Sequence, residues 1–223
     1  GGGVEILVID NASTDHTSSV LAGIVEGAPR IETRYVLEDR QGVAHARNRG
    51  IAEARGEWLA FFDDDQIADA DWLVQLLAAA DERQTLCVGG SVKLLLPDGY
   101  DQPLSSVCRI LLSESPAGSG ACPYRGSRTP GTGNLLVQRT LVSTLGGFDS
   151  AATMGGEDTD LFRRIRAGGV VAWYEPRAVI YHRVPSERLT NAYMVWNARR
   201  TGVHVADLEH RVYGTWRFSL RFA

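Results

Sequence analysis

The sequence predicts an α/β fold with a mainly parallel sheet flanked by helices, because short apolar strands alternate with helical patterns along most of the chain. Two of these strands, at 4–9 and 58–62, are nearly continuous apolar runs, as expected of strands covered on both faces. With 223 residues, of which 44% are hydrophobic, the chain is long enough to bury a sizeable core.

Each expected element has a local signal in the sequence. In chain order they are a strand at 4–9, a helix at 18–25, a strand at 31–37, a helix at 43–55, a strand at 58–62, a helix at 70–80, a strand at 86–96, helices at 138–145 and 158–167, and strands at 170–174 and 178–181. The strands are short apolar runs, whereas the helices repeat apolar residues every three or four positions. Gly56 and the pair Gly168-Gly169 end two of the helices. One helix face is expected to pack on the core and comprises Trp72, Leu73, Leu76, Leu77 and Ala80.

Two segments depart from this alternation. Residues 97–130 are rich in Gly, Ser and Pro with little periodicity, which is typical of a functional loop. From residue 186 onward arginines alternate with aromatic residues. We therefore expect a main domain at 1–185 and a basic, aromatic helical extension at 186–223.

Composition excludes several classes of protein. The net charge of −4 disfavours general nucleic-acid binding. The apolar runs fall far short of the ~20 residues that a membrane span needs. Cys87, Cys108 and Cys122 are odd in number and widely spaced, which argues against a disulfide framework and favours reduced thiols in the cytoplasm.

Carboxylates follow two of the predicted strands directly. Asp10 ends the first strand, and Asp63, Asp64 and Asp65 end the strand at 58–62. In open α/β sheets ligands gather at this end of the strands, and three adjacent carboxylates repel one another unless a positive charge compensates them. A divalent cation with oxygen ligands fits that need. The alternative is a solvated acidic turn that caps the helix starting near Asp69.

Three further segments each allow a functional and a structural interpretation. Arg47, near the start of a predicted helix, is either a surface residue or a phosphate partner. Glu157 and Asp158 lie in the first turn of another helix, where acids favour the helix dipole but where a carboxylate base could also be held. His182 follows a strand and is either a metal ligand or a structural histidine.

Together, these segments occur in the order seen in family 2 glycosyltransferases of the GT-A fold, which the chain resembles over about residues 4–184. The matching motifs are Asp10-Asn11-Ala12-Ser13-Thr14-Asp15, Gly42-Val43-Ala44-His45-Ala46-Arg47-Asn48, Phe61-Phe62-Asp63-Asp64-Asp65, Gly131-Thr132-Gly133-Asn134, Gly146-Gly147-Phe148-Asp149 and Glu157-Asp158. The resemblance implies a Rossmann-like nucleotide-binding sheet. It also implies inverting transfer of a sugar from a UDP-, GDP- or dTDP-sugar to a hydroxyl, in polysaccharide or cell-envelope biosynthesis.

The resemblance implies eight residues that bind the nucleotide or substrate, and five of them belong to the first three motifs. Asp10 corresponds to the acid that contacts the base, with Asn11 beside it, and Arg47 lies in the segment that lines the nucleotide pocket. Asp63 corresponds to the first acid of the D-x-D motif, directed toward the ribose, and Asp64 is the middle residue of that motif.

The same resemblance implies a metal and a base. Asp65 and His182 would hold Mg²⁺ or Mn²⁺ at the diphosphate. Asp158 would be the catalytic base that takes the proton of the acceptor hydroxyl, and Glu157 would bind substrate beside it.

The resemblance gives less detail about the residues that bind the acceptor. Gly133 and Asn134 would border a pocket for a sugar, a lipid-linked or another hydroxyl acceptor. A cytoplasmic location is expected, with residues 186–223 in peripheral contact with the inner face of the plasma membrane, as a basic and aromatic helix can be. The alternative for that segment is a helix pair docked on the domain with its arginines extended to solvent.

One departure from the family pattern favours a competing interpretation. Members usually begin with a strand and a helix before the strand that corresponds to 4–9, and neither is present, so we expect a fragment or a mis-started reading frame. A non-catalytic remnant that acts as a binding or assembly module is therefore the alternative function. A nucleotidyltransferase is a third, but its Gly- and Lys-rich phosphate loop is not seen.

Overall fold

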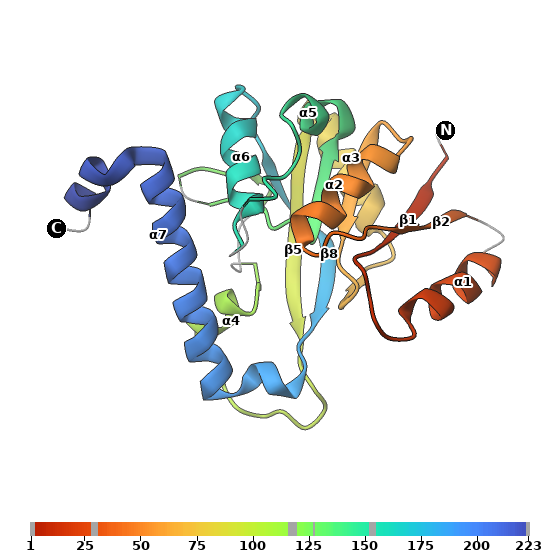
Figure 1. The fold of residues 1–223 in the computed structure, drawn as a ribbon, viewed down its shortest axis with the longest axis horizontal. Helices are drawn as coiled ribbons and strands as arrows, with labels where there is room; N and C mark the ends of the chain where they lie inside the picture. The colour runs from red at the N-terminus through yellow and green to blue at the C-terminus, as the bar shows by residue number, and fades with distance from the viewer. Residues whose placement is uncertain (1–2, 28–30, 116–119, 127, 152–154, 222–223) are drawn as a thin grey trace.

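The computed structural model describes residues 3–27, 31–115, 120–126, 128–151 and 155–221, with only the backbone given for 212, 213 and 215–221 (Figure 1). The strands are β1 (Glu5–Asp10), β2 (Glu32–Leu37), β3 (Trp58–Phe62), β4 (Gln66–Ala68), β5 (Cys87–Leu95), β6 (Cys122–Pro123), β7 (Asn134–Gln138) and β8 (Trp173–Arg183). The helices are α1 (Thr17–Gly27), α2 (Val43–Glu53), α3 (Trp72–Glu82), α4 (Ser106–Leu111), α5 (Arg139–Thr144), α6 (Glu157–Ala167), the short 3-10 helix η1 (Ser186–Leu189) and α7 (Asn191–Arg221).

The strands of the described residues form two sheets. β1 and β2 pair in parallel as a separate two-stranded sheet, and the larger sheet has the order β3-β7-β5-β8-β4, with β6 on β8. The predicted α/β class is confirmed, but the predicted mainly parallel sheet is wrong. Within the larger sheet only β5–β8 is parallel, because β7 inserts antiparallel between β3 and β5, and β4 and β6 also run antiparallel to β8.

Other boundaries also differ from the prediction. The segment 97–130 contains α4 and β6, although the sequence shows little periodicity there. The two strands expected at 170–174 and 178–181 are one strand, β8, whose pairing with β5 shifts register between Gly90 and Ser91. The strand continues past Pro176 because such an irregularity accommodates a residue that cannot donate to the ladder.

The core lies on both faces of the larger sheet. β7 supplies both halves, since Leu135 and Val137 pack toward α2, α5 and α6, while Leu136 packs toward α3. On the α3 side Leu76 is fully buried, as predicted, but Leu77 is 39% exposed and does not belong to the core face. Figure 1 shows the β1–β2 sheet and α1 on one side of this body and α7 on the other.

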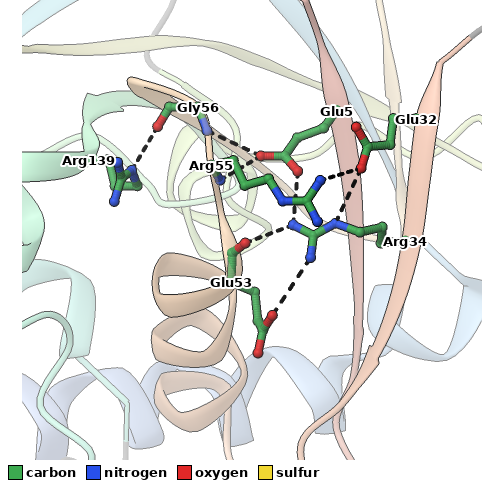
Figure 2. A network of polar contacts seen from close by, with 7 residues as sticks. All are labelled: Glu5, Glu32, Arg34, Glu53, Arg55, Gly56 and Arg139. Carbon is green, nitrogen blue, oxygen red and sulfur yellow. Dashed lines mark hydrogen bonds and ion pairs between the residues drawn. The ribbon is translucent and has the colours of Figure 1, made fainter.

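A charged network joins the small sheet to the rest of the protein, and Figure 2 shows its members, Glu5, Glu32, Arg34, Glu53, Arg55, Gly56 and Arg139. Arg34 Nη2 donates to Glu5 Oε2 at 2.9 Å and to the Glu53 carbonyl at 2.7 Å. Glu5 Oε1 accepts from the backbone N–H of Arg55 at 2.6 Å. Burial acts to raise the pKa of Glu5, but the hydrogen bonds from Arg55 and Arg34 outweigh it and hold the pKa below its ordinary value. The network therefore fixes β1 and β2 against the end of α2.

Replacing Arg34 with methionine is expected to lower the free energy of unfolding by about 1 to 2 kcal/mol, because Glu5 Oε2 and the Glu53 carbonyl both lose the hydrogen bond from Arg34. Urea unfolding followed by circular dichroism measures the change. Arg55→Met is the matched control, since that side chain is 64% exposed and pairs with the exposed Glu32. Equal losses in the two variants would contradict the assigned role of Arg34.

The C-terminal segment begins with η1 and continues as α7, which packs beside α4. The buried Asn197 joins the two helices, because its Nδ2 donates to the Leu111 carbonyl at 2.7 Å. Of the arginines and aromatic residues predicted to mark this extension, several have side chains outside the described part, namely Tyr213, Trp216, Arg217, Phe218 and Arg221. In the described part of the chain no helix is both long and apolar enough to cross a bilayer. No disulfide joins Cys87, Cys108 or Cys122, all of which lie in the described part of the chain.

Candidate functional site

The end of β1 places Asp10 and Asn11 at the junction of the small sheet and α2. Asp10 is buried, with Oδ2 accepting from the Tyr35 hydroxyl at 2.8 Å and Oδ1 from the Ser13 N–H at 2.9 Å. Hydrogen bonds from Ser13 and Tyr35 hold the pKa of Asp10 below its ordinary value. Asn11 Oδ1 accepts from Gly42 N–H at 2.6 Å, at the start of α2. Asn11 therefore positions the helix that carries Arg47.

Arg47 brings together two acids that are far apart in sequence. Its Nη1 donates to Glu157 Oε1 at 2.6 Å, and its Nη2 lies 3.7 Å from Asp63 Oδ1. The guanidinium also stacks over the Phe148 ring, 5.5 Å from the centroid. The Arg47 and Glu157 side chains are only 14% and 8% exposed, so this ion pair is a fixed part of the site.

Asp63 lies beside the other acids of the triplet. Burial raises the pKa of Asp63, Arg47 lowers it, and the carboxylates of Asp65 and Asp64 raise it again, so that the net shift is upward. Gly133 packs directly under this side chain, and a Cβ there would overlap Asp63 Oδ2 and the amide of Gln66. A side chain at position 133 would therefore require Asp63 and Gln66 to move. Asp64 is exposed.

Asp65 and His182 form a second cluster, and the pairing of β4 with β8 brings them together. Gln66 is the register partner of His182, and His182 Nε2 lies 3.2 Å from Asp65 Oδ2. His182 Nδ1 lies 2.9 Å from the Leu112 carbonyl, which can only accept, so Nδ1 carries the hydrogen. Arg188 Nη1 lies 3.3 Å from both Asp65 Oδ2 and His182 Nε2.

Glu157 and Asp158 begin α6, as predicted. Asp158 is part-buried, and its Oδ1 accepts from Thr159 N–H at 2.6 Å, which fixes the carboxylate at the helix start. Glu157 Oε2 is buried without a hydrogen-bond partner in the described residues. Gly156 precedes them with φ of 83°, and the His204 ring of α7 occupies the space that a Cβ would take. Only glycine fits between the two helices.

Asn134 is buried at the start of β7 and is hydrogen-bonded within the protein. It is 2% exposed, its Nδ2 donates to the carbonyls of Ser91 and Ala178, and its Oδ1 accepts from Trp72 Nε1 at 2.7 Å. Both amide hydrogens and one oxygen lone pair are therefore used inside the protein, where they support the sheet, and the predicted place of Asn134 at the acceptor pocket stays a prediction.

A cavity of about 660 Å³ opens where α7 faces the start of α2. Its lining includes Val43 and His45 on α2, Gly155 before α6, and Trp196 and Arg200 on α7. None of the sequence motifs predicts this cavity. Gly155 is two residues before Glu157, so this wall of the cavity lies just before the start of α6.

Two functional candidates escaped the sequence analysis. Arg188 was noted only as a basic residue of the extension, and nothing in its local sequence indicates that it reaches Asp65, 123 positions away. The Leu112 carbonyl, which orients His182, lies in the segment predicted to be irregular. For the other site residues the structure gives the positions described above, and their predicted contacts with substrate and metal stay predictions.

Comparison with solved structures defines the class of fold. The chain superposes on a mannosyltransferase from Pyrobaculum calidifontis, solved with GDP-Man and Mn²⁺, with a TM-score of 0.66 and 24% identity over 95% of the chain. It superposes on GalNAc-T7, solved with UDP, GalNAc and Mn²⁺, with a TM-score of 0.62 and 20% identity over 81% of the chain. The chain spans 55% and 38% of those two proteins. The fold is that of the GT-A glycosyltransferases.

Sequence comparison defines the family. The model for glycosyl transferase family 2 matches residues 1–114, just over half of the 223 residues. Succinoglycan biosynthesis protein ExoM of Rhizobium meliloti (strain 1021) is 29% identical over 97% of the chain, which spans 70% of that protein. A further curated relative is matched over only 22% of its length. The chain belongs to glycosyltransferase family 2.

Proposed function

We propose that this protein transfers a sugar from a nucleoside-diphosphate sugar to an acceptor hydroxyl, with inversion and with the help of a divalent cation. The observation that carries the proposal is the convergence, at one end of the larger sheet, of Asp63 with Arg47 and Glu157 and of Asp65 with His182. The two solved relatives hold UDP or GDP-Man together with Mn²⁺ in folds of the same class, which supports the proposal.

The residues present fit a divalent cation. His182 donates its Nδ1 hydrogen to a backbone carbonyl, as metal-bound histidines generally do, and its Nε2 lone pair faces Asp65 Oδ2. Within the described residues no group of three or more His, Cys, Asp or Glu side chains is placed to hold a metal. Two protein ligands are nevertheless sufficient when the substrate's phosphates and water complete the shell. Bound there, Mg²⁺ or Mn²⁺ would neutralise charge on the leaving diphosphate as a Lewis acid.

Asp158 is the base in this proposal. The acceptor oxygen forms a bond to the anomeric carbon, the bond from that carbon to the diphosphate oxygen breaks, and the hydroxyl proton passes to the Asp158 carboxylate. Oδ1 is held by Thr159, which leaves Oδ2 without a partner among the described residues and available to the proton. Inversion follows if the base and the leaving diphosphate lie on opposite faces of the sugar.

Glu157 and Arg47 would bind the donor. The buried Glu157 Oε2 lacks a hydrogen-bond partner in the described part of the chain, and a buried acceptor of this kind is costly unless a ligand or water donates to it. A hydroxyl group of the bound sugar would donate the missing hydrogen bond to Oε2. Arg47 holds the Glu157 carboxylate in position by donating to Oε1, so the position of Oε2 is fixed as well.

The acceptor and the place of reaction are further parts of the proposal. The cavity between α2 and α7 borders Gly155 and carries Trp196 and Arg200, which suit an acceptor with apolar and anionic groups. ExoM is named for succinoglycan biosynthesis, which supports a role in polysaccharide or cell-envelope assembly. We retain a cytoplasmic location with peripheral membrane contact through residues 186–223.

Asp65→Ala is expected to weaken binding of UDP or GDP in the presence of Mn²⁺ by at least about tenfold, or 1.4 kcal/mol, because the cation loses its carboxylate. Isothermal titration calorimetry measures the affinity with and without Mn²⁺. Asp71→Ala removes an exposed carboxylate just before α3 and is expected to bind as the unaltered protein does. If the unaltered protein binds neither nucleotide with Mn²⁺, the proposal fails and a binding or assembly module becomes the better interpretation.

A further inference from the structure

Arg188 lies where the proposed function requires a metal ion. Its Nη1 is 3.3 Å from Asp65 Oδ2 and 3.3 Å from His182 Nε2. Since the Leu112 carbonyl fixes the hydrogen of His182 on Nδ1, both of these atoms are acceptors. Two acceptors 3.2 Å apart need a positive partner, and the Arg188 guanidinium supplies it.

The guanidinium and a divalent cation cannot share this position. Both are positive and both would occupy the space beside Asp65 Oδ2 and His182 Nε2, so metal binding requires Arg188 to turn away. The side chain is free to do so, because it is 37% exposed and extends from the short helix η1. Arg47 differs, since its side chain is 14% exposed and held by the buried Glu157.

A diphosphate bound at this metal would meet the displaced side chain. Its oxygens are shared with the cation in the proposed function, and they carry the charge that a planar guanidinium binds best. After leaving Asp65, the Arg188 guanidinium would therefore pair with the diphosphate. Asp65 would pair with the cation, so that Arg188 and Asp65 would each keep a partner of opposite charge.

We propose that Arg188 is an exchangeable counter-ion: it holds Asp65 and His182 together before the cation binds, and it pairs with the donor's diphosphate afterward. The proposal rests on the proposed function, because the same two ligands are involved. It assigns to Arg188 two opposite effects, competition with the metal alone and support of the metal–nucleotide complex.

Calorimetry separates these effects. With Mn²⁺ alone, Arg188→Gln is expected to bind the ion about threefold to tenfold more tightly than the unaltered protein, a modest gain because solvent screens the half-exposed charge. With saturating Mn²⁺, the same variant is expected to bind UDP or GDP about threefold to tenfold more weakly. Arg188→Lys, which keeps the charge, should stay near the unaltered protein in the first titration.

Arg183→Gln is the matched control, because it removes one exposed positive charge from the end of β8, close to the same ligands. It is expected to change neither affinity by more than about twofold. Mn²⁺ affinity that is unchanged or lower in Arg188→Gln would overturn the competition, and unchanged nucleotide affinity would overturn the pairing with diphosphate. An unaltered protein that binds neither Mn²⁺ nor nucleotide would overturn the proposed function as well.

Discussion

Replacing Asp158 with asparagine is expected to lower the rate constant of sugar transfer by about a hundredfold to ten-thousandfold, the range that a positioned general base contributes. The substitution keeps the size of the side chain and its ability to accept from Thr159, so α6 should begin as before. It removes the negative charge that takes the proton of the acceptor hydroxyl. Transfer of radiolabelled sugar from a UDP- or GDP-sugar, measured under single-turnover conditions, isolates this step.

Two measurements make the result specific to the base. Binding of UDP or GDP with Mn²⁺ should change by less than about threefold in Asp158→Asn, because the base contacts the acceptor rather than the nucleotide. Asp160→Asn is the control on the same helix, since Asp160 pairs with Arg164 at 2.7 Å and has no assigned part in transfer. A similar loss of rate in both variants would show that the charge of the helix start, and not proton transfer, sets the rate.

The sequence predicted much of the fold and of the site because the signals are local. The strand at 58–62 is recovered with the same bounds, since its apolar run stops at three aspartates. Helix α6 is recovered with Glu157 and Asp158 in its first turn, where its acidic start and glycine end mark it. These elements depend on neighbours in sequence, so pattern and composition suffice.

The parts that the sequence did not predict depend on long-range pairing. β7 has a run of three apolar residues that leads directly into α5, and periodicity does not distinguish such a run from the start of a helix. Its antiparallel insertion between β3 and β5 changes the sheet from parallel to mixed. The contact between Arg188 and Asp65 exists only because β4 pairs with β8, and β4 is three residues long.

Replacing Arg47 with methionine is expected to lower the free energy of unfolding by about 3 kcal/mol, the lower end of the cost of breaking a buried ion pair. Glu157 is 8% exposed at its side chain, and without Arg47 neither of its oxygens would have a described hydrogen-bond partner. Asp63 would lose its nearest cation at the same time. Urea unfolding at neutral pH measures the loss.

The double variant Arg47→Met/Glu157→Leu tests whether the loss comes from the stranded charge. An apolar pair of similar volume is often as stable as the ion pair it replaces, so the double variant should recover most of the lost stability. It should not recover nucleotide binding, because Glu157 and Arg47 would both be absent from the donor site. Recovery of both properties would show that the pair is a structural link between α2 and α6 and that the donor is held by other residues. Recovery of stability alone would support a role of the ion pair in nucleotide binding, because the fold would then be about as stable without it.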